Sequence, residues 1–164
     1  GGSAARQPRS THLILAGDIL RTIGERVRPL LKGKAASGST IGKVVIGTVA
    51  GDIHDIGKDI VTFMLDVSGY DVLDIGVDVP IPVFVKKVRE FKPQVVGLSG
   101  FLTLAFDSMK KTVEALKEAG LRDDLKIMIG GGQMDDEVCK YAGADAYGKD
   151  AVAAVNLARQ WIGG

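Results

Sequence analysis

From residue 43 onward, short apolar runs alternate with longer segments in which apolar residues recur every three or four positions. The short runs are rich in β-branched residues and end in glycine, which is typical of strands that are covered on both faces. The expected strands are residues 43–49, 71–76, 94–100, 126–131 and 144–148. The expected helices are residues 57–68, 82–91, 104–119, 134–142 and 150–162. Five strand–helix repeats predict an α/β fold with a doubly wound, five-stranded parallel sheet.

Residues 1–42 follow a different pattern. Residues 1–10 are expected to be a flexible leader or the remnant of an expression tag. Residues 12–31 carry one apolar stripe that predicts a helix, formed by Leu13, Ala16, Leu20, Ile23, Val27 and Leu30. Small residues over 32–42 indicate a linker. We therefore expect a leader over 1–10, a short helical cap and its linker over 11–42, and one α/β domain over 43–164.

Composition excludes several function classes. The chain has 164 residues, a net charge of +1 and 5% aromatic residues, so neither nucleic acid nor an anionic membrane is an expected partner. No apolar run reaches the ~18 residues of a membrane span, and no signal peptide is recognisable. The single cysteine, Cys139, fits a reducing compartment, so we expect a cytoplasmic protein in which Cys139 is an apolar filler. Trp161 is expected to pack the last helix against the core.

The run from Gly51 to Val61, GDIHDIGKDIV, is the strongest candidate for chemistry. His54 follows an expected strand, and Asp52 is placed to orient its imidazole, as carboxylates commonly do for metal-binding histidines. The chain has only two histidines, which is too few for a protein-built zinc site with about four ligands. If His54 binds a metal, a prosthetic group must supply the other ligands, and a macrocycle meets that requirement.

Other candidates lie where strands end, at the edge of a parallel sheet where ligands bind. Ser99 ends the third expected strand, and its hydroxyl either bonds to nearby backbone or points into a cleft. Gly130, Gly131 and Gly132 form either a loose turn or a place where a flat group slides between strands.

The spacing of these residues resembles the cobalamin-binding domain family. Asp52-x-His54-x-x-Gly57 is followed by Ser99 after 41 intervening residues, and Gly130-Gly131 follows Ser99-Gly100-Phe101 after a further 28. The phrases GDIHDIGKDIV, DIGVDVP and GLRDDLKIMIGG resemble the corrinoid proteins of methanol, methylamine and methoxyaromatic methyltransferase systems, and the corrinoid module of methionine synthase. The resemblance covers residues 43–162 and implies a flavodoxin-like, Rossmann-type cobalamin-binding fold.

The resemblance also implies roles for individual residues. His54 would bind cobalt from below in place of the cofactor's own base, and Asp52 would hold the imidazole and help to pass a proton. The nucleotide tail of a cobalamin or related cobamide would enter a slot between the first and third strands, with Ser99 bonded to it. The implied cofactor-binding residues are Asp52, Ile53, His54, Asp55, Ile56, Gly57, Ser99, Phe101, Thr103, Gly130, Gly131, Gly132, Tyr147 and Asp150.

The resemblance implies a methyl carrier that is not a complete enzyme alone. Its expected partners are a substrate-specific methyltransferase, a second methyltransferase that passes the methyl group to the acceptor, and a reductive activator. Two positions depart from the family: Phe101 stands where leucine is common, and Ala105 replaces a second serine of the methionine synthase proton relay. Relatives usually carry a bundle of several helices as a cap; residues 12–31 supply about one, so a homodimer through that helix is one expected source of cover.

Three alternatives remain at this stage. A cobalamin-binding subunit of an adenosylcobalamin-dependent mutase would share the motif, although the sequence of the segment GDIHDIGKDIV favours the methyl carrier. A phosphoacceptor signalling domain would share the topology, but its third strand should end in aspartate, not Ser99. A flavin-nucleotide binder is disfavoured because Asp52 and Asp55 would repel phosphate.

Overall fold

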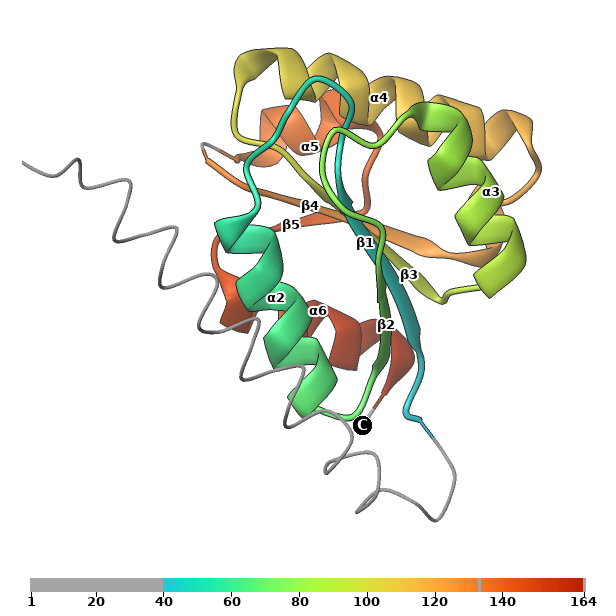
Figure 1. Cartoon of the computed structure of the whole chain (residues 1–164), viewed down its shortest axis with the longest axis vertical. Coiled ribbons are helices and arrows are strands. Elements are labelled where there is room, and N and C mark those ends of the chain that lie inside the picture. The colour runs from blue at the N-terminus through green and yellow to red at the C-terminus, as the bar shows by residue number, and fades with distance from the viewer. Residues whose placement is uncertain (1–39, 133, 164) are drawn as a thin grey trace, which may run out of the picture.

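The computed structural model describes residues 40–132 and 134–163 (Figure 1). The strands are β1 (Lys43–Thr48), β2 (Asp71–Asp74), β3 (Val95–Ser99), β4 (Lys126–Gly130) and β5 (Ala146–Gly148). The helices are α2 (Ile56–Val67), α3 (Ile81–Phe91), α4 (Thr103–Glu118), α5 (Asp136–Ala142) and α6 (Ala151–Ile162), with a short 3-10 helix at Arg122–Asp124 that the pattern did not predict. The expectations for the leader, the helix over 12–31 and most of the linker lie outside the described residues.

All five strands are parallel, in the order β2-β1-β3-β4-β5. Helices α2 and α6 cover one face of the sheet, and α3, α4 and α5 cover the other (Figure 1). The chain leaves β1 toward β2 on one side and then continues through β3 toward β5 on the other. This arrangement confirms the doubly wound fold, and it places a topological switch point beyond the carboxyl ends of β1 and β3.

Two apolar cores flank the sheet because successive side chains of each strand point to opposite faces. Val44, Val95 and Met128 face α2 and α6, whereas Val45 and Ile127 face the other three helices. Trp161 packs against the first of these cores, as expected from its place near the end of the chain.

Cys139 is buried in the second core, which confirms the expectation of an apolar filler. Burial, with Asp136 and Asp145 nearby, raises the pKa of the Cys139 thiol. The thiol therefore stays protonated near neutral pH, which makes it a poor nucleophile.

Local chemistry sets the ends of the elements. Helix α6 begins at Ala151 because the Asp150 side chain accepts a hydrogen bond from the Ala153 N–H, 2.7 Å away, as an N-cap. β2 ends at Asp74, two residues earlier than expected, where the Asp74 carboxylate accepts the Gly76 N–H.

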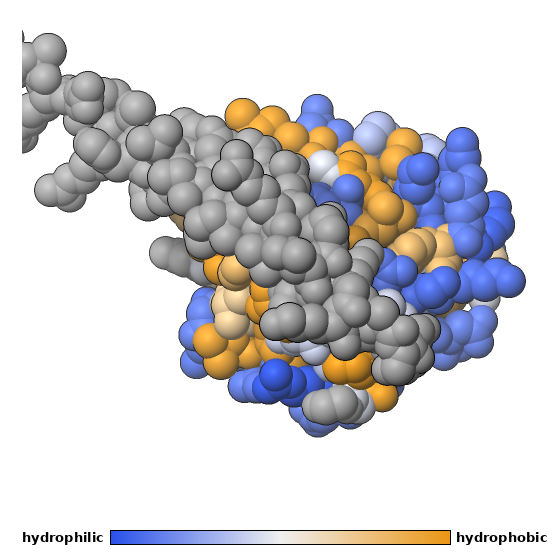
Figure 2. Space-filling view, turned by 60° about the horizontal axis from the view of Figure 1, so that its bottom comes forward, coloured by the Kyte–Doolittle hydropathy of each residue, from blue (hydrophilic) through white to orange (hydrophobic). Residues whose placement is uncertain are grey.

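The described surface mixes hydrophilic and apolar side chains, as the space-filling view in Figure 2 shows. Its large exposed apolar side chains include Val67 at the end of α2 and Val152 in α6. None of the described helices is long and apolar enough to cross a membrane.

Candidate functional site

His54 lies in the loop between β1 and α2 and is held by the buried Asp52. The His54 ring Nδ1 lies 2.7 Å from Asp52 Oδ1, and the His54 backbone N–H donates to the same oxygen. The other carboxylate oxygen accepts the backbone N–H groups of Phe101 and Leu102 from the β3–α4 loop, at 2.7 and 3.0 Å. Asp52 thus joins the two loops that flank the switch point.

Asp52 is 1% exposed. Burial alone would raise the pKa of its carboxyl, but hydrogen bonds from the backbone N–H groups of His54, Leu102 and Phe101 and from the His54 ring outweigh burial and lower that pKa to about 2. An ionised Asp52 accepts only, so His54 Nδ1 carries a proton, and in the neutral imidazole Nε2 keeps its lone pair.

The His54 side chain is 48% exposed and lies beside the Phe101 ring, with 4.6 Å between the ring centres. About half of the side chain is therefore accessible to a ligand. Within residues 40–132 and 134–163, no three His, Cys, Asp or Glu side chains gather in a way that could hold a metal ion. A metal at His54 would therefore need its other ligands from a bound group, as a macrocycle supplies.

The His54 loop is anchored from neighbouring elements. Thr48 Oγ1 donates to the His54 carbonyl, and Ser108 Oγ of α4 donates to the Ala50 carbonyl, each at 2.8 Å. Asp78, in the β2–α3 loop, accepts the Gly51 N–H at 2.7 Å through its carboxylate, and its own N–H donates to the Asp52 carbonyl. The roles of Ser108 and Asp78 could not be predicted from the sequence, because they depend on contacts between distant segments.

Lys58 is another residue whose role was not predicted from the sequence. Its side chain is 3% exposed, and its Nζ lies 2.8 Å from Asp59 Oδ1 and 2.6 Å from Asp74 Oδ2. These ion pairs attach the first turn of α2 to the carboxyl end of β2. The end of the loop that presents His54 is therefore fixed to the sheet.

Replacing Lys58 with methionine is expected to lower the free energy of unfolding by about 3 kcal/mol, because two carboxylates lose their buried partner. Chemical denaturation of the cofactor-free protein measures this change. Lys87→Met is the matched control: Lys87 forms an exposed pair with Glu90 at 3.9 Å, so its loss should cost under about 0.5 kcal/mol. Equal effects of the two substitutions would contradict a structural role for the buried pairs.

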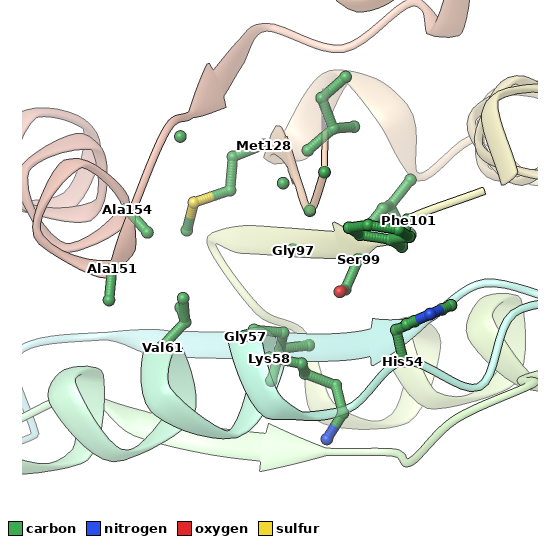
Figure 3. Close-up of a pocket in the computed structure, with 18 of the residues that line it drawn as sticks. His54, Gly57, Lys58, Val61, Gly97, Ser99, Phe101, Met128, Ala151 and Ala154 are labelled. Carbon is green, nitrogen blue, oxygen red and sulfur yellow. The ribbon is translucent and has the colours of Figure 1, made fainter. Parts of the chain in front are cut away.

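A cavity of about 670 Å³ opens beside His54 and runs over the sheet between α2 and α6 (Figure 3). Near the carboxyl ends of the strands its floor consists of small residues, Ser99 of β3, Gly130 of β4 and Gly148 of β5, and Gly97 of β3 lies farther in, between Ile46 and Met128. Ser99, Gly130 and Gly148 are register partners across three strands, and Gly97 is two residues before Ser99. The hollow exists because one face of the sheet lacks large side chains near its carboxyl end.

Most predicted site residues meet in this cavity. Those that line it are Ile53, His54, Asp55, Ile56, Gly57, Ser99, Phe101, Gly130, Gly131, Gly132 and Asp150. Asp52 lies behind His54. Thr103 is exposed at the start of α4, and Tyr147 packs against the core on the opposite face. Neither of these two lines the cavity, so their cofactor contacts stay predictions.

The predicted slot between the first and third strands is wrong. β1 and β3 are register partners from Val44–Val95 to Thr48–Ser99, so no group can pass between them. The cavity lies over these strands instead. Several lining residues were not predicted from the sequence, namely Ile46, Lys58, Val61, Gly97, Met128, Ala151 and Ala154. The alternation of Gly97 with Ser99 was the available signal, since it places small residues on one face.

Glycines along the cavity have two distinct functions. An added Cβ at Gly57 would meet no atom within 4 Å, and one at Gly130 would approach only the Gly148 carbonyl, at 3.7 Å. Side chains at these positions would occupy the space that a ligand needs. Gly131 has a φ of +125°, and a Cβ there would overlap the Gly100 backbone, so this glycine is required by the fold itself.

Residues 42–156 match the model of the B12 binding domain family. The chain belongs to this family. It is 40% identical over 148 residues to trimethylamine corrinoid protein 1 of Methanosarcina acetivorans, covering 90% of this chain and 68% of that protein. The fit of the site agrees with B12 binding: a half-exposed imidazole with a free nitrogen stands at the mouth of a cavity with a glycine-rich floor.

Two solved structures share the fold of this B12-binding chain. A cobalamin-binding protein from Desulfitobacterium hafniense superposes with a TM-score of 0.74 and 44% identity, covering 93% of this chain and 71% of that one. The methanol:cobalamin methyltransferase complex MtaBC from Methanosarcina barkeri superposes with a TM-score of 0.73 and 32% identity, covering 81% of this chain and 51% of the matched chain.

Proposed function

We propose that this protein is a corrinoid protein: it binds a cobamide with His54 as the lower axial ligand and carries a methyl group between methyltransferases. The observation that carries the proposal is the pairing of His54 with the buried, ionised Asp52 at the mouth of the cavity. An imidazole presented in this way would supply one nitrogen to the cofactor's metal, and the cavity beside it would hold the cofactor's nucleotide.

The protein's own residues hold and orient the group. Asp52 keeps the proton on His54 Nδ1 and makes Nε2 a better donor. When bound, the cofactor supplies the methyl-transfer chemistry, and the protein supplies ligation and orientation. Ala105 lies where a second relay serine would stand, and Asp52 already accepts two backbone N–H groups from Phe101 and Leu102. The proposed proton path therefore ends at Asp52 or continues through water.

The relatives support a methyl carrier over a mutase subunit, because those reported above are a trimethylamine corrinoid protein, a cobalamin-binding protein and a methyltransferase complex. We propose that this chain likewise works with a substrate-specific methyltransferase and a second methyltransferase. A reductive activator, a homodimer through residues 12–31 and a cytoplasmic location stay predictions.

Replacing His54 with alanine tests the proposal. We expect the variant to keep cobamide through the cavity, with affinity reduced about tenfold, a loss of about 1.4 kcal/mol. Its absorption spectrum should shift because water replaces the imidazole on the metal. The protein is reconstituted with hydroxocobalamin, and bound cofactor is measured after desalting.

His12→Ala is the matched control, since His12 is the other histidine of the chain. Its spectrum should equal that of the unmodified protein. An unchanged spectrum in the His54 variant would reject His54 as the axial ligand.

A further inference from the structure

We propose that the cavity selects cobamides with an apolar benzimidazole as lower base over cobamides with a purine base. This inference rests on the proposed function, because it concerns the nucleotide displaced by His54. It identifies the class of cofactor that the site accepts, which the His54 motif leaves open.

The inner end of the cavity is lined by apolar side chains from three elements. Val61 of α2, Met128 of β4, and Ala151 and Ala154 of α6 lie around the space in Figure 3, and Gly97 of β3 also lines it. Met128 and Ala154 belong to the buried core on this face. A planar group that reaches this end meets carbon and sulfur on its sides.

Two charged side chains of the lining are committed to contacts outside the cavity. Lys58 Nζ is occupied by Asp59 and Asp74, and its side chain points away from the cavity in Figure 3. Asp150 caps α6, and the neighbouring Lys149 is exposed. Within the described lining, Ser99 is the polar side chain of the floor, and its hydroxyl points into the cavity.

The backbone of the floor is committed as well. β3 and β4 pair from Val95–Lys126 to Ser99–Gly130, so their amides and carbonyls serve the sheet. The ladder continues beyond the strands, where the Ser99 carbonyl accepts the Val49 N–H and the Gly130 carbonyl accepts the Gly100 N–H, each at 3.0 Å. Across β3 and β4, the floor therefore offers no row of free donors and acceptors with which to recognise a polar base edge.

This apolar lining is expected to bind a purine base more weakly than a benzimidazole base. Both bases carry an imidazole nitrogen that one hydroxyl can satisfy. Adenine adds an exocyclic amino group and pyrimidine nitrogens, and burial without partners is unfavourable for each such group. Dimethylbenzimidazole adds two methyl groups, whose burial is favourable. The expected preference for dimethylbenzimidazole is at least about tenfold in Kd.

Equilibrium dialysis of the full chain against three cofactors tests the inference. The probes are hydroxocobalamin, its adenine-based analogue and cobinamide, which lacks the nucleotide. We expect the adenine analogue to bind at least tenfold more weakly than hydroxocobalamin. Cobinamide should also bind more weakly than hydroxocobalamin, because it leaves the cavity without a base.

Met128→Gln places an amide at the inner end with little change in volume. It should weaken hydroxocobalamin binding and reduce the preference over the adenine analogue to about threefold or less. Met64→Gln is the matched control, because Met64 of α2 does not line the cavity. Ala154→Ser provides a second, smaller change if the Met128 variant does not fold, as judged by circular dichroism.

The possible outcomes distinguish a failure of base selection from a failure of the proposed function. Equal affinity for the two complete cobamides would overturn base selection while leaving the corrinoid function intact. Equal affinity for cobinamide and hydroxocobalamin would also overturn it, because the base would then contribute nothing. Failure to bind any of the three would reject the proposed function itself.

Discussion

Replacing Gly130 with valine is expected to weaken cobamide binding at least about 100-fold while leaving the fold intact. Gly130 sits between its register partners Ser99 and Gly148 on the floor of the cavity. A valine there has β-compatible geometry, and its Cβ would approach only the Gly148 carbonyl, at 3.7 Å. Its methyl groups would project into the space needed by the nucleotide.

The free energy of unfolding of the cofactor-free Gly130 variant should stay within about 1 kcal/mol of the unmodified protein. Cofactor retention after desalting and chemical denaturation measure the two effects on the same sample. A variant that binds hydroxocobalamin with unchanged affinity would show that the nucleotide does not lie over β4.

Placing the same valine one residue later, at Gly131, is expected to damage the fold. The backbone of Gly131 has a φ of +125°, which is unfavourable for a β-branched residue, and the added Cβ would overlap the Gly100 carbonyl. The tips of β3 and β4 would have to separate. We expect a loss of about 4 kcal/mol in the free energy of unfolding, with cofactor binding lost as a consequence.

The two variants form a matched pair. The same substitution at neighbouring positions distinguishes a glycine that leaves room for the ligand from a glycine that the backbone conformation requires. Thermal unfolding of the cofactor-free proteins decides between them, since the Gly131 variant should melt well below the Gly130 variant. Equal melting temperatures would contradict the close approach of Gly131 to Gly100.

Much of the fold could be predicted because it is encoded locally. Apolar runs ending in glycine marked the strands, and periodicity marked the helices, so the described elements begin and end within about two residues of expectation. The pairing of Asp52 with His54 was also predictable, since two residues of separation bring a carboxylate to an imidazole within one loop.

The rest of the site depends on contacts that no local pattern contains. Lys58 meets Asp74 across 16 residues, and Asp78 meets Gly51 across 27. The location of the cavity follows from which strands are neighbours. Because β1 and β3 pair directly, the cavity lies over one face of the sheet and not between these strands. Met128 and Ala154, which lie on that face, therefore line it.

The most direct test of the account asks which nitrogen lies beneath the cobalt. The protein is produced with nitrogen-15 in its histidines, loaded with unlabelled hydroxocobalamin, reduced by one electron and examined by electron paramagnetic resonance. If His54 is the axial ligand, each cobalt line is split into a doublet by the labelled nitrogen, and His54→Ala removes that splitting. Triplets that persist in the labelled protein would show that the cofactor's own base remains on the metal, which would contradict the account.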